Sequence, residues 1–167
     1  MFFLIGYMCS GKTTTAIALS KLMEKKYCDL DDYIVDKYKL SINQFFFKYG
    51  EQYFRNIETD SLRLLIKENK YNIISCGGGT PCFNNNLLLM QKSGEVIYLK
   101  LSAETLANRI ENYKVTRPLV NNLYGKELLN FVKEQLKERE KYYLLADVII
   151  KADNLSPEEI AKLIFYQ

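Results

Sequence analysis

The sequence predicts an α/β fold built on a parallel β-sheet. Short apolar runs alternate with longer segments of helical pattern along its 167 residues, and this alternation is typical of βαβ units. In addition, the glycine-rich motif "GYMCSGKT" at residues 6–13 lies between the first apolar run and the first helical segment. This is the position that a phosphate-binding loop requires.

The chain contains candidates for five strands. One lies around Tyr27 to Leu30, and the other four are the apolar runs "FFLI" at 2–5, "NIIS" at 72–75, "EVIYLKL" at 95–101 and "DVII" at 147–150. Ser156 and Glu159 form a capping-box pattern that predicts the start of the last helix. Because no linker or internal repeat divides the chain, we expect one domain over residues 1–167.

Two regions depart from the simple alternation. Residues 32–70 form a long, mainly helical insertion, in which Ser41 and Gln44 make a second capping-box pattern. Residues 112–125 contain Pro118 and scattered asparagines, which favour an irregular segment. Each region is a candidate flap over a site.

The charge of the chain is nearly balanced. It has 23 basic and 20 acidic residues, a net charge of +3, which gives no argument for binding nucleic acid or a membrane. A small anionic substrate fits this balance. The apolar opening "MFFLIGYMC" has no basic leader and no small-residue cleavage site, so we interpret it as a buried strand of a cytoplasmic protein.

The stretch "CGGGTPC" at residues 76–82 permits two interpretations. A metal or disulfide loop would make Cys76 and Cys82 the important residues, whereas a ligand against the main chain would require Gly77 to Gly79. The chain has no histidine and no C-x-x-C pair, which disfavours zinc and favours free thiols. The lack of histidine also means that any general base is a carboxylate or something rarer.

The motif at residues 6–13 predicts contacts with nucleotide phosphates. Main-chain N–H groups would surround the phosphates, Lys12 would reach the β- and γ-phosphates, and the Thr13 hydroxyl would bind Mg²⁺. A glycine turn with a lone surface lysine is the plain alternative. The expected phosphate contacts in this segment are Cys9, Ser10, Gly11, Lys12, Thr13 and Thr14.

Asp29 and Asp31 in "DLDDYI" follow the second predicted strand. Carboxylates two residues apart on an extended chain point the same way, so they can serve one metal or one substrate together. A surface or helix-capping role is equally open for this pattern.

Three arginines are ambiguous when taken alone. Arg55 with Glu58 has the i, i+3 spacing of a common solvated ion pair, and Arg139 lies on a charged helix face. Arg117, in the irregular segment, could close over a transferring phosphoryl group or lie on the surface of its loop.

The motifs "GYMCSGKT", "DLD", "FRNIE", "CGGG", "RPL" and "LKEREKYY" occur in this order over nearly the whole chain. Together they resemble the shikimate kinase family. The resemblance implies a P-loop kinase fold with a five-stranded parallel sheet flanked by helices, a substrate-binding insertion at 32–70 and a lid at 112–125. It also implies a monomeric enzyme that uses ATP and Mg²⁺ to phosphorylate the 3-hydroxyl of shikimate in aromatic amino acid biosynthesis.

The resemblance assigns a role to each matching position. Asp31 would bind the ring hydroxyls of the substrate, Asp29 would support Mg²⁺, and Arg55 and Arg139 would hold the substrate carboxylate. Gly78, as the middle glycine, would contact the substrate through its backbone. The implied sets are substrate-binding Asp31, Arg55, Gly77, Gly78, Gly79 and Arg139; metal-binding Thr13 and Asp29; and catalytic Lys12, Asp31 and Arg117.

Arg117 would contact the ATP phosphates from the lid, and Arg109 would lie near the adenine. The chemistry agrees with these roles, because guanidinium groups bind planar carboxylates bidentately. Since phosphoryl transfer needs little early proton removal, Asp31 would orient the nucleophile and accept its proton late. Lys12, Mg²⁺ and Arg117 would stabilise the developing charge.

The sequence departs from the family pattern in three places. Cys9 occupies a phosphate-loop position where glycine is usual, and Thr80 and Pro81 follow the triplet where small residues are usual; we expect neither change to touch the substrate roles directly. The segment after Arg139 lacks a common proline. Our hypothesis is that the Cys9 thiol lies close to the phosphates, where Lys12 and the helix N-terminus favour its thiolate.

Two other functions remain open from the sequence. Another kinase of the same fold, such as a gluconate kinase, would act on a different hydroxy acid, but Arg55 and the glycine triplet favour shikimate. A non-catalytic nucleotide switch would give Arg55 and Arg139 no function. The pattern N-K-x-D, with which GTPases recognise guanine, is also absent.

Overall fold

The computed structural model describes residues 1–112, 120 and 123–166. Its centre is a five-stranded sheet in the order β2-β3-β1-β4-β5, in which every neighbouring pair is parallel. The strands are β1 (Phe2–Ile5), β2 (Tyr27–Asp29), β3 (Ile73–Ser75), β4 (Glu95–Lys100) and β5 (Val148–Lys151). The predicted α/β class, the parallel sheet and the five strands are therefore confirmed.

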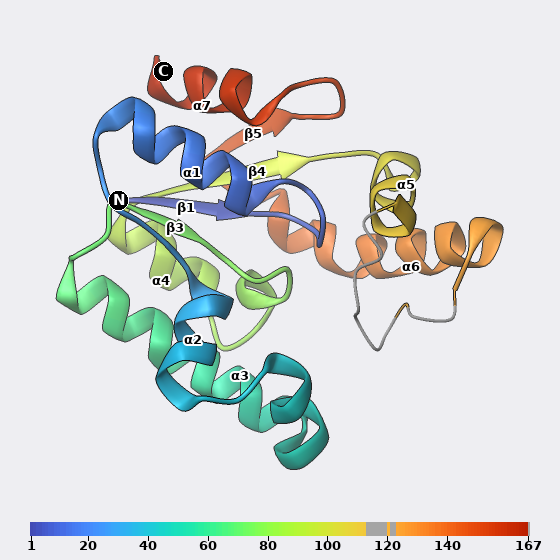
Figure 1. The fold of residues 1–167 in the computed structure, drawn as a ribbon, viewed down its shortest axis with the longest axis horizontal. Coiled ribbons are helices and arrows are strands. Elements are labelled where there is room, and N and C mark those ends of the chain that lie inside the picture. The colour runs from blue at the N-terminus through green and yellow to red at the C-terminus, as the bar shows by residue number, and fades with distance from the viewer. Residues whose placement is uncertain (113–119, 121–122, 167) are drawn as a thin grey trace.

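Helices cover both sides of the sheet (Figure 1). On one side α1 (Lys12–Met23) packs against α7 (Pro157–Phe165), and on the other lie α3 (Ile42–Glu68), α4 (Asn86–Ser93) and α6 (Gly125–Tyr143). The remaining elements are α2 (Leu30–Tyr38), the short 3₁₀ helix η1 (Thr80–Cys82) and α5 (Ala103–Asn112). No helix in the described part of the chain is long and apolar enough to cross a membrane.

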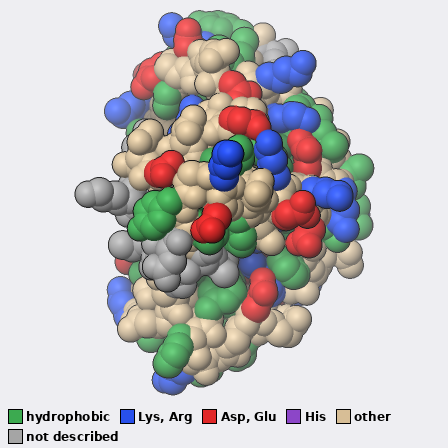
Figure 2. Space-filling model, turned by 90° about the vertical axis from the view of Figure 1, so that its right-hand side faces the viewer, with side chains coloured by type: hydrophobic (Ala, Val, Ile, Leu, Met, Phe, Trp, Pro, Cys, Tyr) green, Lys and Arg blue, Asp and Glu red, His purple; other side chains and the backbone are tan. Residues whose placement is uncertain are grey.

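The central strands are buried because helices cover both of their faces. Phe3, Leu4 and Ile5 of β1 are fully buried, as are Ile73 and Ile74 of β3. The apolar opening of the chain is thus a core strand, as predicted. Basic and acidic side chains are interspersed on the face shown in Figure 2, in keeping with the balanced composition.

The insertion predicted over residues 32–70 contains most of α2, which begins at Leu30, and all of α3. Both halves of the capping box at the start of α3 are present, since Ser41 accepts from the Gln44 backbone and Gln44 accepts from the Ser41 backbone. Gly50 interrupts α3 with φ of 80°, a left-handed value that glycine adopts readily. Most of the lid predicted over 112–125, including Arg117, lies outside the described residues, so its role stays a prediction.

The sheet order places three chain segments at one edge. β1 lies between β3 and β4, and the register pairs Leu4 with Ser75 and Ser75 with Asp29. The carboxyl ends of β1, β2 and β3 therefore lie side by side. Open α/β sheets bind ligands at this position.

Candidate active site

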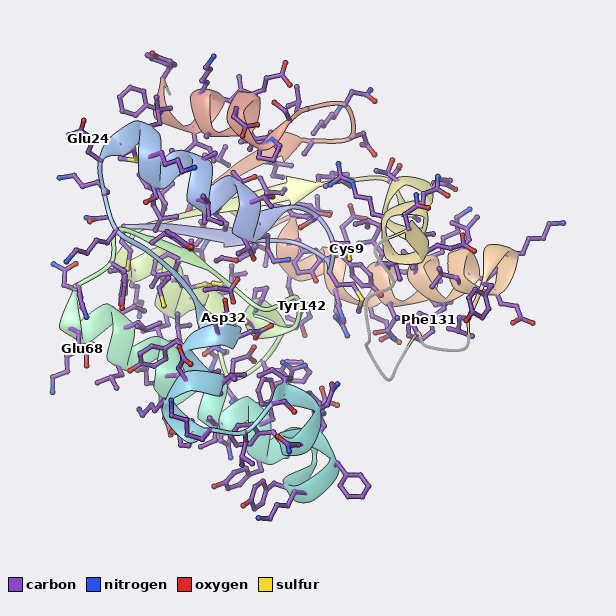
Figure 3. All side chains as sticks on the ribbon, in the orientation of Figure 1. Cys9, Glu24, Asp32, Glu68, Phe131 and Tyr142 are labelled. Carbon is purple, nitrogen blue, oxygen red and sulfur yellow. The ribbon has the colours of Figure 1, made fainter. Side chains whose placement is uncertain are left out.

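The phosphate-loop motif forms the connection between β1 and α1. Gly11 is the N-cap residue of α1 with φ of 91°, and it provides no side-chain cap for the first turn. The helix therefore begins with N–H groups available to an anion. Cys9 has φ of 60°, a left-handed value that explains why glycine suits this position. Cys9 lies at the end of the sheet nearest α5 and α6 (Figure 3).

Lys12 is held against this loop rather than projecting into solvent. Its side-chain ammonium donates to the Tyr7 carbonyl at 2.8 Å and to the Ser10 hydroxyl at 3.4 Å. Only 9% of Lys12 is exposed. The glycine turn with a lone surface lysine is therefore the wrong interpretation of the motif.

Arg109 lies against the same loop from α5. Its guanidinium donates to the Cys9 carbonyl at 3.3 Å. A Cβ atom added at Gly11 would lie 3.7 Å from the same guanidinium. Arg109 is thus next to the expected phosphate site, and its proposed position beside the adenine stays a prediction.

Thr13, Asp29 and Ser75 converge where α1, β2 and β3 meet. The Thr13 hydroxyl donates to Asp29 Oδ2 at 2.7 Å, and the Ser75 hydroxyl donates to the same oxygen at 2.9 Å. These are hard oxygen donors with a single carboxylate. Mg²⁺ commonly uses such a set together with water and substrate phosphates, so the residues present fit the ion.

The two carboxylates of "DLD" have separate environments. The strand ends at Asp29, which caps α2 by accepting from the backbone N–H groups of Asp31 and Asp32 at 3.0 and 3.4 Å. Asp31 consequently lies in the first turn of a helix, so the expectation of two parallel carboxylates on an extended chain is wrong. Asp29 faces Thr13, whereas Asp31 faces the glycine triplet, 2.9 Å from a Cβ added at Gly77.

Arg55 is buried within a cage of acidic and aromatic side chains. It donates to Glu58 Oε2 at 2.9 Å and to Glu51 Oε1 at 3.1 and 3.2 Å. Its guanidinium also lies 4.3 Å from the centre of the Phe83 ring. Arg55 is 7% exposed and Glu58 is 0% exposed, so the interpretation as a solvated surface ion pair is wrong.

The segment after the glycine triplet also contacts this cage. Thr80 donates its hydroxyl to Glu58 Oε1 at 2.6 Å, and Asn84 donates to the Arg55 carbonyl at 3.1 Å. Glu58 therefore links Thr80 to Arg55, since it accepts hydrogen bonds from both. The connection of Thr80 with Arg55 is thus indirect, and a direct role of Thr80 toward the substrate was not expected.

Glycine is needed in the triplet because neighbouring atoms leave little room for a side chain, and not because of the backbone conformation. None of its three residues has positive φ. A Cβ at Gly79 would lie 2.5 Å from Arg55 Nη2, and one at Gly77 would lie 2.9 Å from Asp31 Oδ1. At Gly78 the nearest atoms, the Gly6 carbonyl oxygen and the Met8 nitrogen, are both at 3.5 Å, which is ordinary van der Waals contact. The side chains of the protein itself therefore exclude a side chain at two of the three positions.

Arg139 reaches the triplet from α6. Its guanidinium lies 3.7 Å from a Cβ added at Gly78 and 5.6 Å from the centre of the Tyr7 ring. Gln135 accepts a hydrogen bond from it at 2.9 Å. Arg139 and Arg55 thus approach neighbouring glycines, one from α6 and one from α3.

The cysteines are free thiols. Burial raises the pKa of Cys76 well above its ordinary value and that of Cys82 to about 11, so both thiols are protonated at neutral pH. The described residues contain no group of three or more His, Cys, Asp or Glu side chains that could hold a metal ion. The interpretation of "CGGGTPC" as a disulfide loop is wrong in this structure.

The structure brings most of the predicted residues to one edge of the sheet. Arg117 lies outside the described residues. Ser75 and Phe83 are contacts that the sequence did not identify, and Glu58 was expected only as a solvated partner of Arg55. A signal existed for Ser75, because it ends a strand beside the one that ends at Asp29, and for Glu58 in its i, i+3 spacing. Phe83 had none.

Comparison with known proteins gives a consistent result. Residues 8–167 match the family model described as shikimate kinase. The chain is 41% identical over 156 residues to a shikimate kinase of Parabacteroides distasonis, which covers 93% of this chain and 90% of that protein.

Two solved structures are similar over nearly the whole chain. A shikimate kinase of Bacteroides thetaiotaomicron superposes with a TM-score of 0.93 at 31% identity, covering 99% of this chain and 96% of the other. A shikimate kinase of Acinetobacter baumannii in complex with shikimate gives 0.87 at 29% identity, with 98% and 89% covered.

Proposed function

This chain belongs to the shikimate kinase family, and we propose that it transfers the γ-phosphoryl group of ATP to the 3-hydroxyl of shikimate. The product would be shikimate 3-phosphate, in the biosynthesis of chorismate and aromatic amino acids. The enzyme would act as a cytoplasmic monomer on small-molecule substrates, with no nucleic-acid or membrane partner.

The observation that carries this proposal is the set of side chains around the glycine triplet. Asp31 lies beside Gly77, Arg139 beside Gly78 and Arg55 beside Gly79. A carboxylate and two guanidinium groups suit an acceptor with ring hydroxyls and a carboxylate. A Cβ atom added at Gly78 would also lie 3.5 Å from the backbone nitrogen of Met8, in the phosphate loop. An acceptor bound at the triplet would therefore lie next to ATP.

In the proposed mechanism the loop after β1 binds the ATP phosphates. The N–H groups at the start of α1 and the Lys12 ammonium would face the β- and γ-phosphates. Lys12 would exchange its bond to the Tyr7 carbonyl for one to phosphate oxygen. Thr13 and Asp29 would hold Mg²⁺, which supplies charge neutralisation at the phosphates when it is bound.

Asp31 would orient the hydroxyl that attacks the γ-phosphorus atom. An aspartate has an ordinary pKa of about 3.9, so it is a weak base for an alcohol. A loose transition state asks for little proton removal before the P–O bond to the leaving group weakens. Asp31 would therefore accept the proton late, and Arg117, in our proposal a lid residue, would add positive charge at the phosphates.

Arg55 and Arg139 would hold the substrate carboxylate at the other end of the ring. The cage of Glu58, Glu51 and Phe83 fixes the Arg55 guanidinium before the substrate arrives. Preorganisation of this kind lowers the entropy lost on binding.

An ADP-release assay with ATP and Mg²⁺ tests the proposal, with shikimate, quinate, gluconate and nucleoside monophosphates as separate acceptors. We expect turnover with shikimate and little with the others. Turnover with a different acceptor but none with shikimate would refute the assignment in favour of another kinase of this fold. No acceptor-dependent ADP release at all would favour the nucleotide switch.

Two variants test the site assignment in the same assay. Arg55→Ala should weaken shikimate binding with little effect on ATP affinity, whereas Asp31→Asn should mainly lower turnover. An equal loss of ATP binding in either variant would mean that the acceptor and nucleotide sites are wrongly assigned.

A further inference from the structure

The last residue of α6 makes a hydrogen bond to the glycine triplet. Tyr143 donates its phenolic hydroxyl to the Gly78 carbonyl oxygen at 2.6 Å. The bond joins segments 65 residues apart in the chain. The side chain of Tyr143 is 0% exposed. It therefore forms a buried hydrogen bond to the main chain of the glycine triplet, which faces the proposed acceptor.

Packing holds the phenol in this position. The rings of Tyr143 and Tyr98 lie 5.1 Å apart with an interplanar angle of 40°, which is within the range of favourable aromatic pairs. Burial raises the pKa of Tyr143 far above its ordinary value. The hydroxyl is therefore a permanent donor at physiological pH, and the Gly78 carbonyl is its acceptor.

Fixing this carbonyl also fixes an N–H group. In a trans peptide the C=O and N–H bonds point in opposite directions, so the N–H of Gly79 points away from Tyr143. Among the described residues, the N–H groups of Gly78 and Gly79 have no hydrogen-bond partner. The Thr80 N–H donates to the Gly77 carbonyl at 3.1 Å and closes a turn around the peptide between Gly78 and Gly79. A peptide between two glycines still rotates with little steric resistance, so the bond from Tyr143 adds a restraint that holds these donors in one direction.

The same turn of α6 carries Arg139, four residues before Tyr143. Residues at this spacing lie on one face of a helix. One rigid element thus sets both the guanidinium beside Gly78 and the direction of the Gly78 carbonyl.

We propose that Tyr143 is a positioning residue for the acceptor, whose hydroxyl orients the glycine triplet so that its free N–H groups face shikimate. This inference rests on the proposed function. Tyr143 itself does not contact the reacting atoms. Its contribution is to present main-chain donors, at a fixed distance from Arg139, to the oxygens of a polyhydroxylated acid.

Tyr143→Phe tests the inference, because it removes the hydroxyl and keeps the ring. Tyr98→Phe is the matched control: it removes the hydroxyl of the neighbouring ring, which bonds to Glu140 at 3.4 Å and not to the triplet. We expect the KM for shikimate to rise roughly tenfold in Tyr143→Phe, as for the loss of one positioned hydrogen bond. The KM for ATP should stay within about twofold of the original value in both variants.

A binding measurement adds a readout that does not depend on turnover. The ¹⁵N-amide resonance of Gly79 should shift when shikimate is added to the unaltered chain and to Tyr98→Phe, and should shift much less in Tyr143→Phe at the same concentration.

The outcomes separate this inference from the proposed function. Failure of the unaltered chain to phosphorylate shikimate would refute the proposed function and this inference with it. Normal turnover of the unaltered chain, with the same shikimate KM in both variants, would refute this inference alone. Equal increases in the KM for shikimate and for ATP in Tyr143→Phe would also overturn it, because they indicate a general structural role.

Discussion

Glu58→Gln is the most informative change outside the proposed acceptor contacts. Glu58 is fully buried, and its two oxygens accept from different partners, Arg55 at 2.9 Å and Thr80 at 2.6 Å. Glutamine has the same shape but one acceptor oxygen and no charge. If that oxygen faces Arg55, the new amide N–H group can donate to Thr80, whose hydroxyl can rotate to accept. Both contacts survive, and the charge is what is lost.

The expected magnitude follows from this geometry. Hydrogen bonds to charged groups contribute about 1.5–3 kcal/mol and neutral ones about 0.5–1.5 kcal/mol. The difference between these two ranges, together with the weaker pairing of the buried Arg55 guanidinium, predicts that Glu58→Gln loses about 2 kcal/mol in the free energy of unfolding. For a chain of this size each kcal/mol lowers Tm by about 2–4 °C, so we expect a decrease of about 4–8 °C.

Glu51→Gln is the matched control, because Glu51 pairs with the same arginine from an exposed position. Its side chain is 56% exposed, compared with 1% for Glu58. Exposed ion pairs contribute about 0–1 kcal/mol, so Glu51→Gln should leave Tm nearly unchanged. Differential scanning calorimetry measures both variants, and steady-state kinetics should show a raised shikimate KM with an unchanged ATP KM for Glu58→Gln alone.

Two results would refute this reasoning. Equal Tm values for Glu58→Gln and Glu51→Gln would mean that burial does not strengthen the pair with Arg55. A destabilised Glu58→Gln with an unchanged shikimate KM would mean that Arg55 does not need Glu58 to bind the acceptor.

Three further predictions use the glycines and the thiols. Gly79→Ala should lower both Tm and shikimate affinity, because the new Cβ lies 2.5 Å from Arg55. Gly78→Ala should raise the shikimate KM at nearly unchanged Tm. A lower Tm for Gly78→Ala than for Gly79→Ala would contradict this. ATP should slow alkylation of Cys9, as followed by peptide mass spectrometry, and labelling insensitive to ATP would show that the thiol lies away from the phosphates. The pKa of Cys82 is raised to about 11, and the thiolate is the reactive form. The alkylation rate of Cys82 should therefore be low at pH 8 and should increase about tenfold per pH unit below that pKa. Rapid labelling at pH 8 would contradict the raised pKa.

Local patterns were sufficient for several elements. The apolar run at residues 2–5 predicted β1, and the capping boxes at Ser41 and Ser156 mark the starts of α3 and α7. Such features depend on neighbours within a few residues, so the sequence carries the whole signal. The phosphate loop belongs to the same class, because its glycines, Lys12 and Thr13 are contiguous.

The order of the acidic residues showed the limit of this approach. An extended chain would have aimed Asp29 and Asp31 at one target, but Asp29 caps a helix that begins at the next residue. The pattern of "DLDD" is compatible with a strand end and with a helix start. In the structure Asp29 Oδ1 caps the helix, while Asp29 Oδ2 accepts from Thr13 and Ser75, which belong to distant segments.

The sequence by itself determined the fold class, the phosphate loop and the set of motifs that marks the family. Only the tertiary structure decided why the triplet is glycine: the side chains of Asp31 and Arg55 occupy the space beside Gly77 and Gly79. It also decided that the Arg55–Glu58 pair is buried and that Tyr143 bonds to Gly78. The physical reason is that steric exclusion and burial depend on which segments pack together, and α3, α6 and the triplet meet only when the sheet and its helices assemble.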